Sequence, residues 1–244
     1  MITPDAAYWS TVQQARAIKE GKFSSRELLE LLVERESLIN ENLNAVVTLD
    51  LDRARLAADA ADEALAAGRS YGPLHGIPVT IKDALETKGL RSTGGATELS
   101  DYVPNRDAPV VDAIKRAGAI VFGKTNLPRW SGDIQSYNEI FGTTVNPWNS
   151  ERVPGGSSGG AAAAVSAGLT SFEIGTDIGG SIRFPASFCG IYGHKPSFGI
   201  VPSTGYLDHR HGGMTEADVN VIGPLARSAE DLELLTTLML RQEG

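Results

Sequence analysis

The 244-residue sequence has very little cysteine, no excess of basic residues and no long hydrophobic run. Cys189 is its single cysteine, which excludes an intrachain disulfide framework, and we expect it to be a small buried residue. The formal net charge of −8 argues against non-specific binding of nucleic acid or anionic membranes, since both require a basic surface. The most apolar stretch, residues 161–172, is too short to cross a bilayer. The first residues, MITPDAAYWS, lack the regions of a signal peptide, so we expect a soluble cytoplasmic protein.

Apolar patterning and turn residues divide the chain into a helical first part and a mixed second part. Residues 24–27, Ser-Ser-Arg-Glu, form a capping-box pattern ahead of regularly spaced leucines, which predicts a helix. A second helix, rich in Ala, Asp and Glu, is predicted from about residue 52 to residue 67 and ends at Gly68. We therefore expect residues 1–70 to form an N-terminal helical segment that packs on a core made of residues 71–244, within a single domain overall.

Beyond residue 73 the pattern changes to alternating strands and helices. Short apolar, β-branched runs predict strands, and amphipathic or small-residue runs predict helices. Strands are predicted at residues 77–81, 119–122 and 170–174, and helices at residues 107–117, 159–167 and from 228 onwards. This alternation predicts an α/β fold with a mixed, partly parallel β-sheet flanked by helices.

Residues 118–125, Gly-Ala-Ile-Val-Phe-Gly-Lys-Thr, match the Walker A pattern of nucleotide-binding loops. In such a loop the four central residues follow a strand and cradle phosphate, whereas here these four residues form the predicted strand itself. Pro128 follows closely and disfavours a helix directly after the motif. We therefore interpret the match as accidental and expect no nucleotide cofactor.

Residues 155–159, Gly-Gly-Ser-Ser-Gly, match G-x-S-x-G, the nucleophile elbow of α/β-hydrolases. That elbow requires an apolar strand directly before the serine, but residues 146–154 are polar and contain two prolines. Its catalytic histidine would have to come from the C-terminal part of the chain, where no histidine lies in a recognisable motif. These candidates are His194, His209 and His211. The elbow, with Ser157 as nucleophile, is therefore the less favoured alternative.

Two glycine-rich stretches place serines where the backbone can turn sharply. The first, residues 154–164, reads PGGSSGGAAAA; the second, residues 175–186, reads GTDIGGSIRFPA, and we predict it to be a turn between a strand and a short helix. Glycines let successive N–H groups converge next to the Ser181 hydroxyl, because glycine permits positive φ and close approach. A serine beside convergent N–H groups is what an acyl-transfer enzyme requires. Lys82 lies at the end of the strand at residues 77–81, the position where α/β sites gather.

Several blocks between residues 72 and 227 resemble the amidase signature family of serine hydrolases. They occur in the order found in that family, at residues 76–83 (GIPVTIKD), 118–126, 141–148 (FGTTVNPW), 154–160, 175–186 and 193–196 (GHKP). A flexible Gly/Ser linker would share the composition of one block but would not bring the others. The resemblance implies the amidase signature fold, here apparently truncated at its C-terminal end, and the activity of a serine amidohydrolase.

The resemblance implies a Ser-Ser-Lys triad. Ser181 corresponds to the nucleophile, Ser157 to the residue that relays its proton, and Lys82 to the base, which must be buried to be neutral. The Gly156–Ser157 peptide bond is implied to be cis, with Ser158 as a supporting hydrogen-bond partner.

The resemblance also implies how a substrate is held. The oxyanion hole consists of the N–H groups of four consecutive residues, Ile178, Gly179, Gly180 and Ser181. The segment at residues 130–133, which contains Ser131, is expected along the substrate pocket. No metal ion or cofactor is implied.

We expect an amidase that hydrolyses the C–N bond of a small carboxylic amide through an acyl-enzyme intermediate. Two alternatives stay open: an inactive, truncated amidase-like fragment or binding module, and an amidotransferase A-type subunit that acts on glutamine with partner subunits. Phe184 makes the chain resemble the free amidases more than the amidotransferase branch, which usually has glutamine at this position. We expect no membrane and no direct nucleic-acid partner, whereas a homo-oligomer or a missing C-terminal half could complete the site. Burial of Lys82 separates the active from the inactive alternative, since a hydrated lysine stays protonated.

Overall fold

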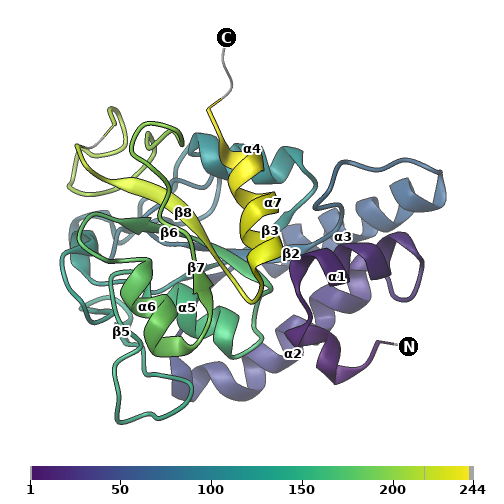
Figure 1. Ribbon diagram of the computed structural model, residues 1–244, viewed down its shortest axis with the longest axis horizontal. Coiled ribbons are helices and arrows are strands. Elements are labelled where there is room, and N and C mark those ends of the chain that lie inside the picture. The colour runs from purple at the N-terminus through teal and green to yellow at the C-terminus, as the bar shows by residue number, and fades with distance from the viewer. Residues whose placement is uncertain (1, 217, 242–244) are drawn as a thin grey trace.

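The computed structural model describes residues 2–216 and 218–241, and Figure 1 shows strands flanked by helices. The helices are α1 (Thr11–Lys19), α2 (Ser25–Leu43), α3 (Leu51–Ala66), α4 (Pro109–Arg116), α5 (Gly159–Ser166), α6 (Arg183–Cys189) and α7 (Ala229–Met239). The strands are β1 (Val46–Leu49), β2 (Pro78–Lys82), β3 (Ile120–Thr125), β4 (Tyr137–Asn138), β5 (Gly142–Thr143), β6 (Phe172–Asp177), β7 (Tyr192–Gly193) and β8 (Val221–Ala226). Short 3₁₀ helices lie at Pro4–Tyr8, Thr97–Leu99 and Arg129–Ser131.

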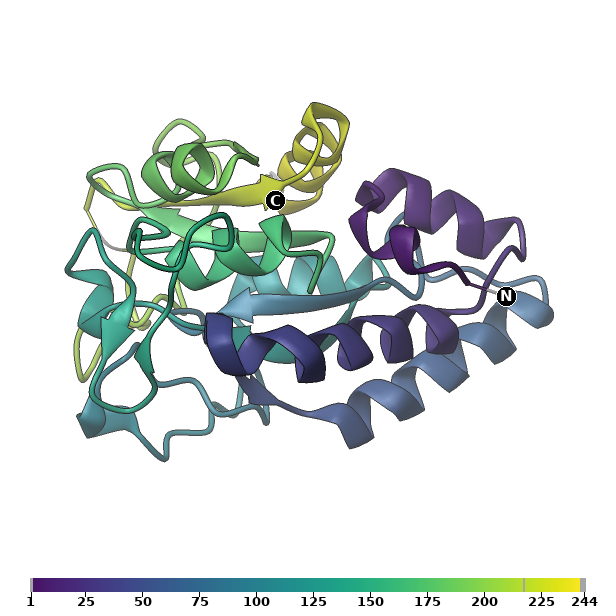
Figure 2. The same cartoon turned by 90° about the horizontal axis from the view of Figure 1, so that it is seen from below.

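The two long N-terminal helices begin and end largely where the sequence predicts. Ser24 caps α2: its hydroxyl accepts from the Glu27 N–H at 3.0 Å, and the Glu27 carboxylate accepts from the Ser24 N–H at 2.8 Å. This confirms the predicted capping box. Helices α2 and α3 lie side by side, as Figure 2 shows. The strand β1 between them was not predicted, because its four residues are too few to reveal an alternating pattern.

The strands form two three-stranded sheets and one short two-stranded pair. In the sheet β1-β3-β2, strands β2 and β3 are parallel and β1 is antiparallel to β3. The sheet β6-β8-β7 is antiparallel throughout, and its edge strand β6 lies against β2. The predicted α/β fold with a mixed, partly parallel sheet is therefore confirmed.

Helix α5 packs against strands of both sheets, and its small residues explain how it can do so. Every residue from Gly159 to Val165 is buried. A Cβ atom on Gly160 would lie 2.5 Å from the backbone nitrogen of Asn126, so only glycine fits there. This close approach brings the N-terminus of α5 to the ends of β2 and β6.

Two strands run further than the sequence predicts. Strand β6 continues to Asp177, so the prediction that residues 175–177 belong to a turn was wrong; these residues pair with 221–223 of β8, far along the sequence. Strand β3 continues through Lys124, which donates to the Leu85 carbonyl at 2.6 Å. Three of the four central residues of the Walker A match, 120–122, thus belong to a strand, and its lysine is buried, which agrees with an accidental match.

Within the described ranges, none of the helices combines the length and the apolar character that crossing a membrane requires.

Candidate functional site

Lys82 lies at the end of β2 and is completely buried, with 0% of its surface exposed. Its ammonium nitrogen is hydrogen-bonded to three hydroxyls, at 2.7 Å from Ser157 Oγ, 3.0 Å from Ser158 Oγ and 2.7 Å from Thr176 Oγ1. Two of these residues precede or begin α5, and the third belongs to β6. Three segments that are distant in sequence therefore meet at one nitrogen atom.

Burial lowers the pKa of Lys82 to about 7, because the charged form loses its hydration. The negative charges of Asp177 and Glu173 oppose this shift and favour the ammonium form. A lysine with a pKa near neutrality has a substantial neutral fraction, which can accept a proton from a neighbouring hydroxyl.

Glycines bring the Ser157 loop into place. The Gly156–Ser157 peptide bond is cis, as the resemblance implies. A Cβ atom on Gly156 would lie 2.6 Å from the carbonyl oxygen of Asp133, so a larger residue has no room. The Ser158 N–H donates to the carbonyl of Ser181 at 3.1 Å, which joins this loop to the second glycine-rich loop.

Asp177 organises the loop that carries Ser181. Its carboxylate accepts from the N–H groups of Gly180 at 2.8 Å and Ile182 at 3.0 Å, and it forms an ion pair with Arg183 at 2.8 Å. Burial alone would raise the pKa of Asp177, but these donors outweigh it and hold the pKa below its usual value. Asp177 therefore stays ionised near neutrality and fixes the turn.

The N–H groups of this loop differ in availability. The Gly180 N–H is occupied by Asp177, so in this arrangement it is not free to bind an oxyanion. In the described part of the chain, the N–H groups of Ile178, Gly179 and Ser181 have no acceptor. Ser181 is partly exposed, whereas Lys82 is enclosed, so the site opens to the surface on the Ser181 side.

Ser131 belongs to a short turn with unusual backbone angles. Trp130 and Ser131 both have positive φ, at 52° and 56°, and the Trp130 N–H donates to the Gly94 carbonyl at 2.8 Å. Among the described residues, the buried Ser131 hydroxyl has no hydrogen-bond partner. A buried hydroxyl without a partner is uncommon, and the predicted role of Ser131 in binding substrate stays a prediction.

The other candidate nucleophiles and bases lie outside this cluster. Cys189 is buried, which confirms the expectation of a small buried residue, and burial raises the pKa of its thiol to about 12. His209 is exposed and its ring nitrogen lies 2.6 Å from Asp208. Within the described residues, the hydrogen-bond partner of Ser157 Oγ is Lys82 and not a histidine, which argues against a nucleophile elbow.

The sequence analysis missed two residues of this cluster. Thr176 lies in a block that the resemblance includes, but only the structure shows its contact with Lys82. Glu173 is a charged residue inside the apolar strand β6, a sequence signal that was available but not used. Its burial is complete, and it accepts a hydrogen bond from Thr125 at 3.0 Å.

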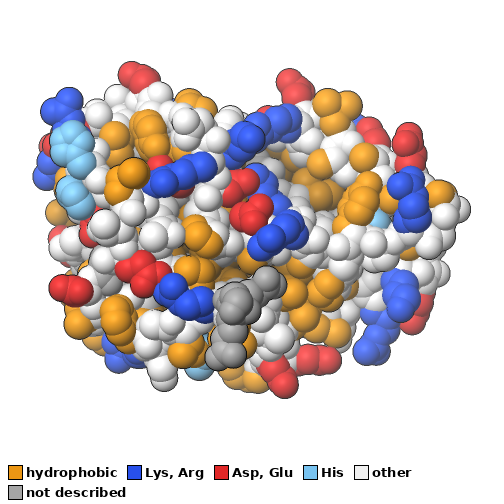
Figure 3. All heavy atoms as spheres, turned by 90° about the horizontal axis from the view of Figure 1, so that it is seen from above, with side chains coloured by type: hydrophobic (Ala, Val, Ile, Leu, Met, Phe, Trp, Pro, Cys, Tyr) orange, Lys and Arg blue, Asp and Glu red, His pale blue; other side chains and the backbone are white. Residues whose placement is uncertain are grey.

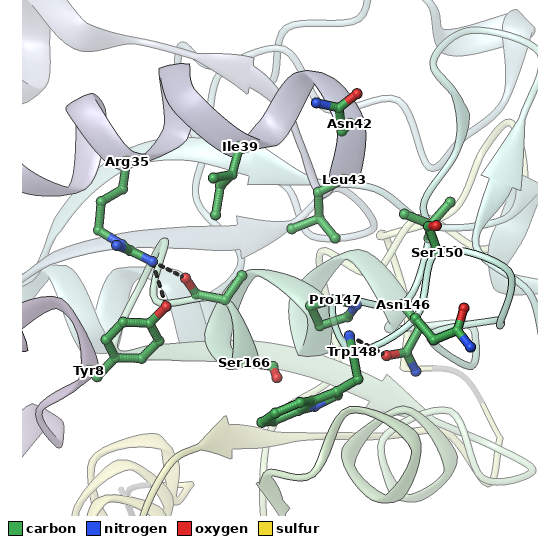
Figure 4. A pocket seen from close by; sticks show the side chains of 13 residues that line it. Tyr8, Arg35, Ile39, Asn42, Leu43, Asn146, Pro147, Trp148, Ser150 and Ser166 are labelled. Atoms are coloured by element: carbon green, nitrogen blue, oxygen red, sulfur yellow. Dashed lines mark hydrogen bonds between the residues drawn. The ribbon is translucent and has the colours of Figure 1, made fainter.

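A cavity of about 520 Å³ lies away from this cluster, between α2, α5 and residues 145–150 (Figure 4). Arg35 in its wall donates to the Tyr8 hydroxyl at 2.6 Å and to the Ala167 carbonyl at 2.8 Å. Its guanidinium is therefore already engaged. Across residues 2–216 and 218–241, no three His, Cys, Asp or Glu side chains are grouped so that they could hold a metal ion. On the face in Figure 3, basic side chains are interspersed with acidic and hydrophobic ones rather than forming one continuous basic surface.

The fold and the cluster define an α/β protein in which a buried lysine is hydrogen-bonded to serines beside a glycine-rich loop. A family model described as Amidase matches residues 27–243, which is most of the chain. The chain therefore belongs to the Amidase family, the amidase signature enzymes. The resemblance is confirmed, and the match begins well before residue 72.

Curated relatives and solved structures agree with this assignment. An A-type glutamyl-tRNA(Gln) amidotransferase subunit from Synechococcus sp. (strain CC9311) is 42% identical over 222 residues, covering 91% of this chain and 44% of that protein. The peptide amidase from Stenotrophomonas maltophilia superimposes with a TM-score of 0.86 at 32% identity, covering 96% of this chain and 48% of that one. A fatty acid amide hydrolase gives 0.85 at 31% identity, covering 96% and 42%. The chain spans about half the length of the relatives it matches.

Proposed function

We propose that this chain carries the catalytic centre of an amidase that hydrolyses the C–N bond of a carboxylic amide. Ser181 is the nucleophile, Ser157 relays its proton and Lys82 is the base. The observation that carries the proposal is the 2.7 Å hydrogen bond between the completely buried Lys82 nitrogen and Ser157 Oγ. A base with a pKa of about 7 in that position can accept a proton where a solvated lysine cannot.

In the first half of the reaction, neutral Lys82 accepts the Ser157 proton while Ser157 accepts the Ser181 proton. The Ser181 oxygen forms a bond to the carbonyl carbon of the amide, and the carbonyl oxygen becomes an oxyanion. We assign its stabilisation to the N–H groups of Ile178, Gly179 and Ser181, which have no acceptor within the described residues. The Gly180 N–H contributes only if it leaves Asp177.

In the second half, the proton returns through Ser157 to the leaving amine, and the C–N bond breaks. The acyl group then remains on Ser181 as an ester. Water, activated by the same lysine and serine, attacks this ester, and the carboxylic acid is released. We also assign Ser131 to the substrate pocket, as the family resemblance implies.

The loop that carries Ser181 and the helix α6 that follows it expose three large apolar side chains, Ile178 at 55%, Phe184 at 44% and Phe188 at 48%. The matched relatives are about twice as long as this chain, so a further segment of this type would cover these side chains and complete the pocket. We propose that residues 1–70 and 71–244 form one unit, and that such a segment or a second copy covers its exposed apolar side chains.

A second candidate is an amidotransferase A-type subunit, and the names of the curated relatives favour it. In that function the same centre would release ammonia from glutamine and pass it to partner subunits. Ammonia release from glutamine, compared with release from a panel of simple amides, separates the two candidates. A rate with glutamine that rises only when amidotransferase partner subunits are added would favour the second.

The proposal is tested by labelling the folded chain with a fluorophosphonate, which loses fluoride when a serine oxygen attacks its phosphorus atom. Peptide mass mapping should find the adduct on Ser181, and it should be lost in Lys82→Ala. Ser166→Ala is a matched control, because this serine lies at the far end of α5, which follows Ser157, and donates to the Cys189 carbonyl instead. An adduct on Ser157 would instead support the nucleophile elbow. A folded chain without any adduct would contradict the proposal and support the inactive alternative.

A further inference from the structure

The two three-stranded sheets meet beside Lys82 through side chains. Strand β2 is the edge of one sheet and β6 the edge of the other, and the two strands are in contact. Lys82 reaches across to Thr176 at 2.7 Å, and Thr125 of β3 reaches across to Glu173 Oε1 at 3.0 Å. These two hydrogen bonds therefore hold the seam at which the base is located.

Glu173 is unusual for a residue within such a seam. It is completely buried in β6, where it pairs with Leu225 of β8. Its second carboxyl oxygen accepts from the Ile174 N–H at 3.1 Å, and within the described residues it forms no ion pair. A buried carboxyl costs free energy unless it is well hydrogen-bonded, and the proposed reaction does not use this one.

The partner of Glu173 is the residue directly beside the base. Thr125 is the register partner of Lys82 in the parallel pair of β2 and β3, and its carbonyl accepts the N–H of Asp83 at 3.0 Å. Glu173 thus fixes the strand residue against which Lys82 lies.

The charge of Glu173 also acts on Lys82, because Glu173 is bonded to Thr125, and Thr125 is the register partner of Lys82. The charged groups that act on Lys82 are Asp177 and Glu173, both on β6, and Lys124 on β3 acts in turn on Glu173. Asp177 is already paired with Arg183, so Glu173 is the carboxyl whose charge is free to vary.

We propose that Glu173 is a positioning residue of this site: its hydrogen bond with Thr125 ties β3 to β6 beside β2, and its ionisation favours the protonated form of Lys82. Burial raises the pKa of Glu173 to about 7 and lowers that of Lys82 to about 7, so both groups change charge over the same pH range. When Glu173 loses its proton, its negative charge therefore shifts the loss of the Lys82 proton to higher pH. The inference relies on the proposed function only in taking Lys82 as the base.

The test is a titration of Lys82 by NMR, with ¹³C at the lysine ε position, in the full chain and in Glu173→Gln. Glutamine keeps an oxygen acceptor for Thr125 but removes the charge, so the Lys82 midpoint should move to lower pH by roughly one unit. The acidic limb of Ser181 labelling should move in the same direction. Asp231→Asn is the matched control, since Asp231 is buried on α7 and accepts from the N–H groups of Thr11 and Val12. It should leave the midpoint unchanged.

A folded Glu173→Gln variant with an unchanged Lys82 midpoint overturns the inference. If that variant does not fold, the test is made on the unaltered chain, in which Glu173 is titrated with ¹³C at the glutamate δ position. The titration curve of Lys82 should then show an inflection at the midpoint of Glu173. Two titrations that are independent of each other overturn the inference. A Lys82 midpoint that shifts in a chain without Ser181 labelling would support the coupling and contradict the proposed function. The two failures are thus distinguishable.

Discussion

The pH dependence of Ser181 acylation follows directly from the burial of Lys82. With a pKa of about 7 rather than 10.5, about half of Lys82 is neutral at pH 7, about a tenth at pH 6 and roughly one hundredth at pH 5. At its ordinary pKa of 10.5 the neutral fraction at pH 7 would be only about 0.0003. Burial therefore increases the amount of usable base by roughly a thousandfold, which corresponds to about 4 kcal/mol.

The assay is the second-order rate of fluorophosphonate labelling of Ser181 between pH 5 and 9, at constant ionic strength. We expect a single acidic limb with a midpoint near pH 7, because only neutral Lys82 accepts a proton. Lys82→Met keeps the length of the side chain but has no base, so its rate should fall by about 10²- to 10⁴-fold and should lose the acidic limb. Circular dichroism at each pH controls for unfolding. A midpoint near pH 10, or a Lys82→Met variant that labels at the original rate, would refute the reasoning.

Three further predictions concern stability and the loop. Because the pKa of Lys82 is lowered in the folded state, the unfolded chain binds more protons between about pH 7 and 10. The free energy of unfolding should therefore rise with pH in this range, by up to about 1.4 kcal/mol per pH unit. Urea unfolding measures this rise, which should be absent in Lys82→Met. Asp177→Asn removes the charge that binds the N–H groups of Gly180 and Ile182, so the rate of Ser181 labelling should fall by roughly 10- to 100-fold. An unchanged rate in a folded variant would show that these hydrogen bonds do not determine the conformation of the turn. Gly160→Ala should destabilise the fold by roughly 3 kcal/mol, because the added Cβ atom meets the backbone of Asn126. In Gly179→Ala the added Cβ atom has no other atom within 4 Å, so this variant should retain the original melting temperature. Equal melting temperatures for the two variants would contradict the packing argument.

Local sequence predicted the secondary structure best where capping and turn chemistry act within a few residues. The capping box of Ser24 and Glu27 correctly predicted where α2 begins. Gly68, with a φ of 74°, follows α3 as predicted. Where pairing with a distant strand decides the conformation, the local signal was insufficient. Residues 175–177 are glycine-containing and resemble a turn, yet β8 extends them as a strand.

The site divides in the same way. The sequence placed Lys82 at a strand end and both serines in glycine-rich loops, because residue type, spacing and resemblance are visible in one dimension. It did not reveal the contact of Lys82 with Thr176 or that of Thr125 with Glu173, because each joins strands that are far apart in the sequence.

The sequence by itself therefore determined which chemical groups are present, which segments are helical or extended near their own caps and turns, and the family to which the chain belongs. Only the tertiary structure decided the state of those groups. A lysine has its ordinary pKa in water, and that of Lys82 falls to about 7 because β3, β6 and α5 together exclude solvent from it. Likewise, the Gly180 N–H is directed to Asp177 by the folded turn, so its availability depends on geometry rather than on residue type. Solvation and hydrogen-bond direction arise from neighbours that the chain supplies only when it is folded.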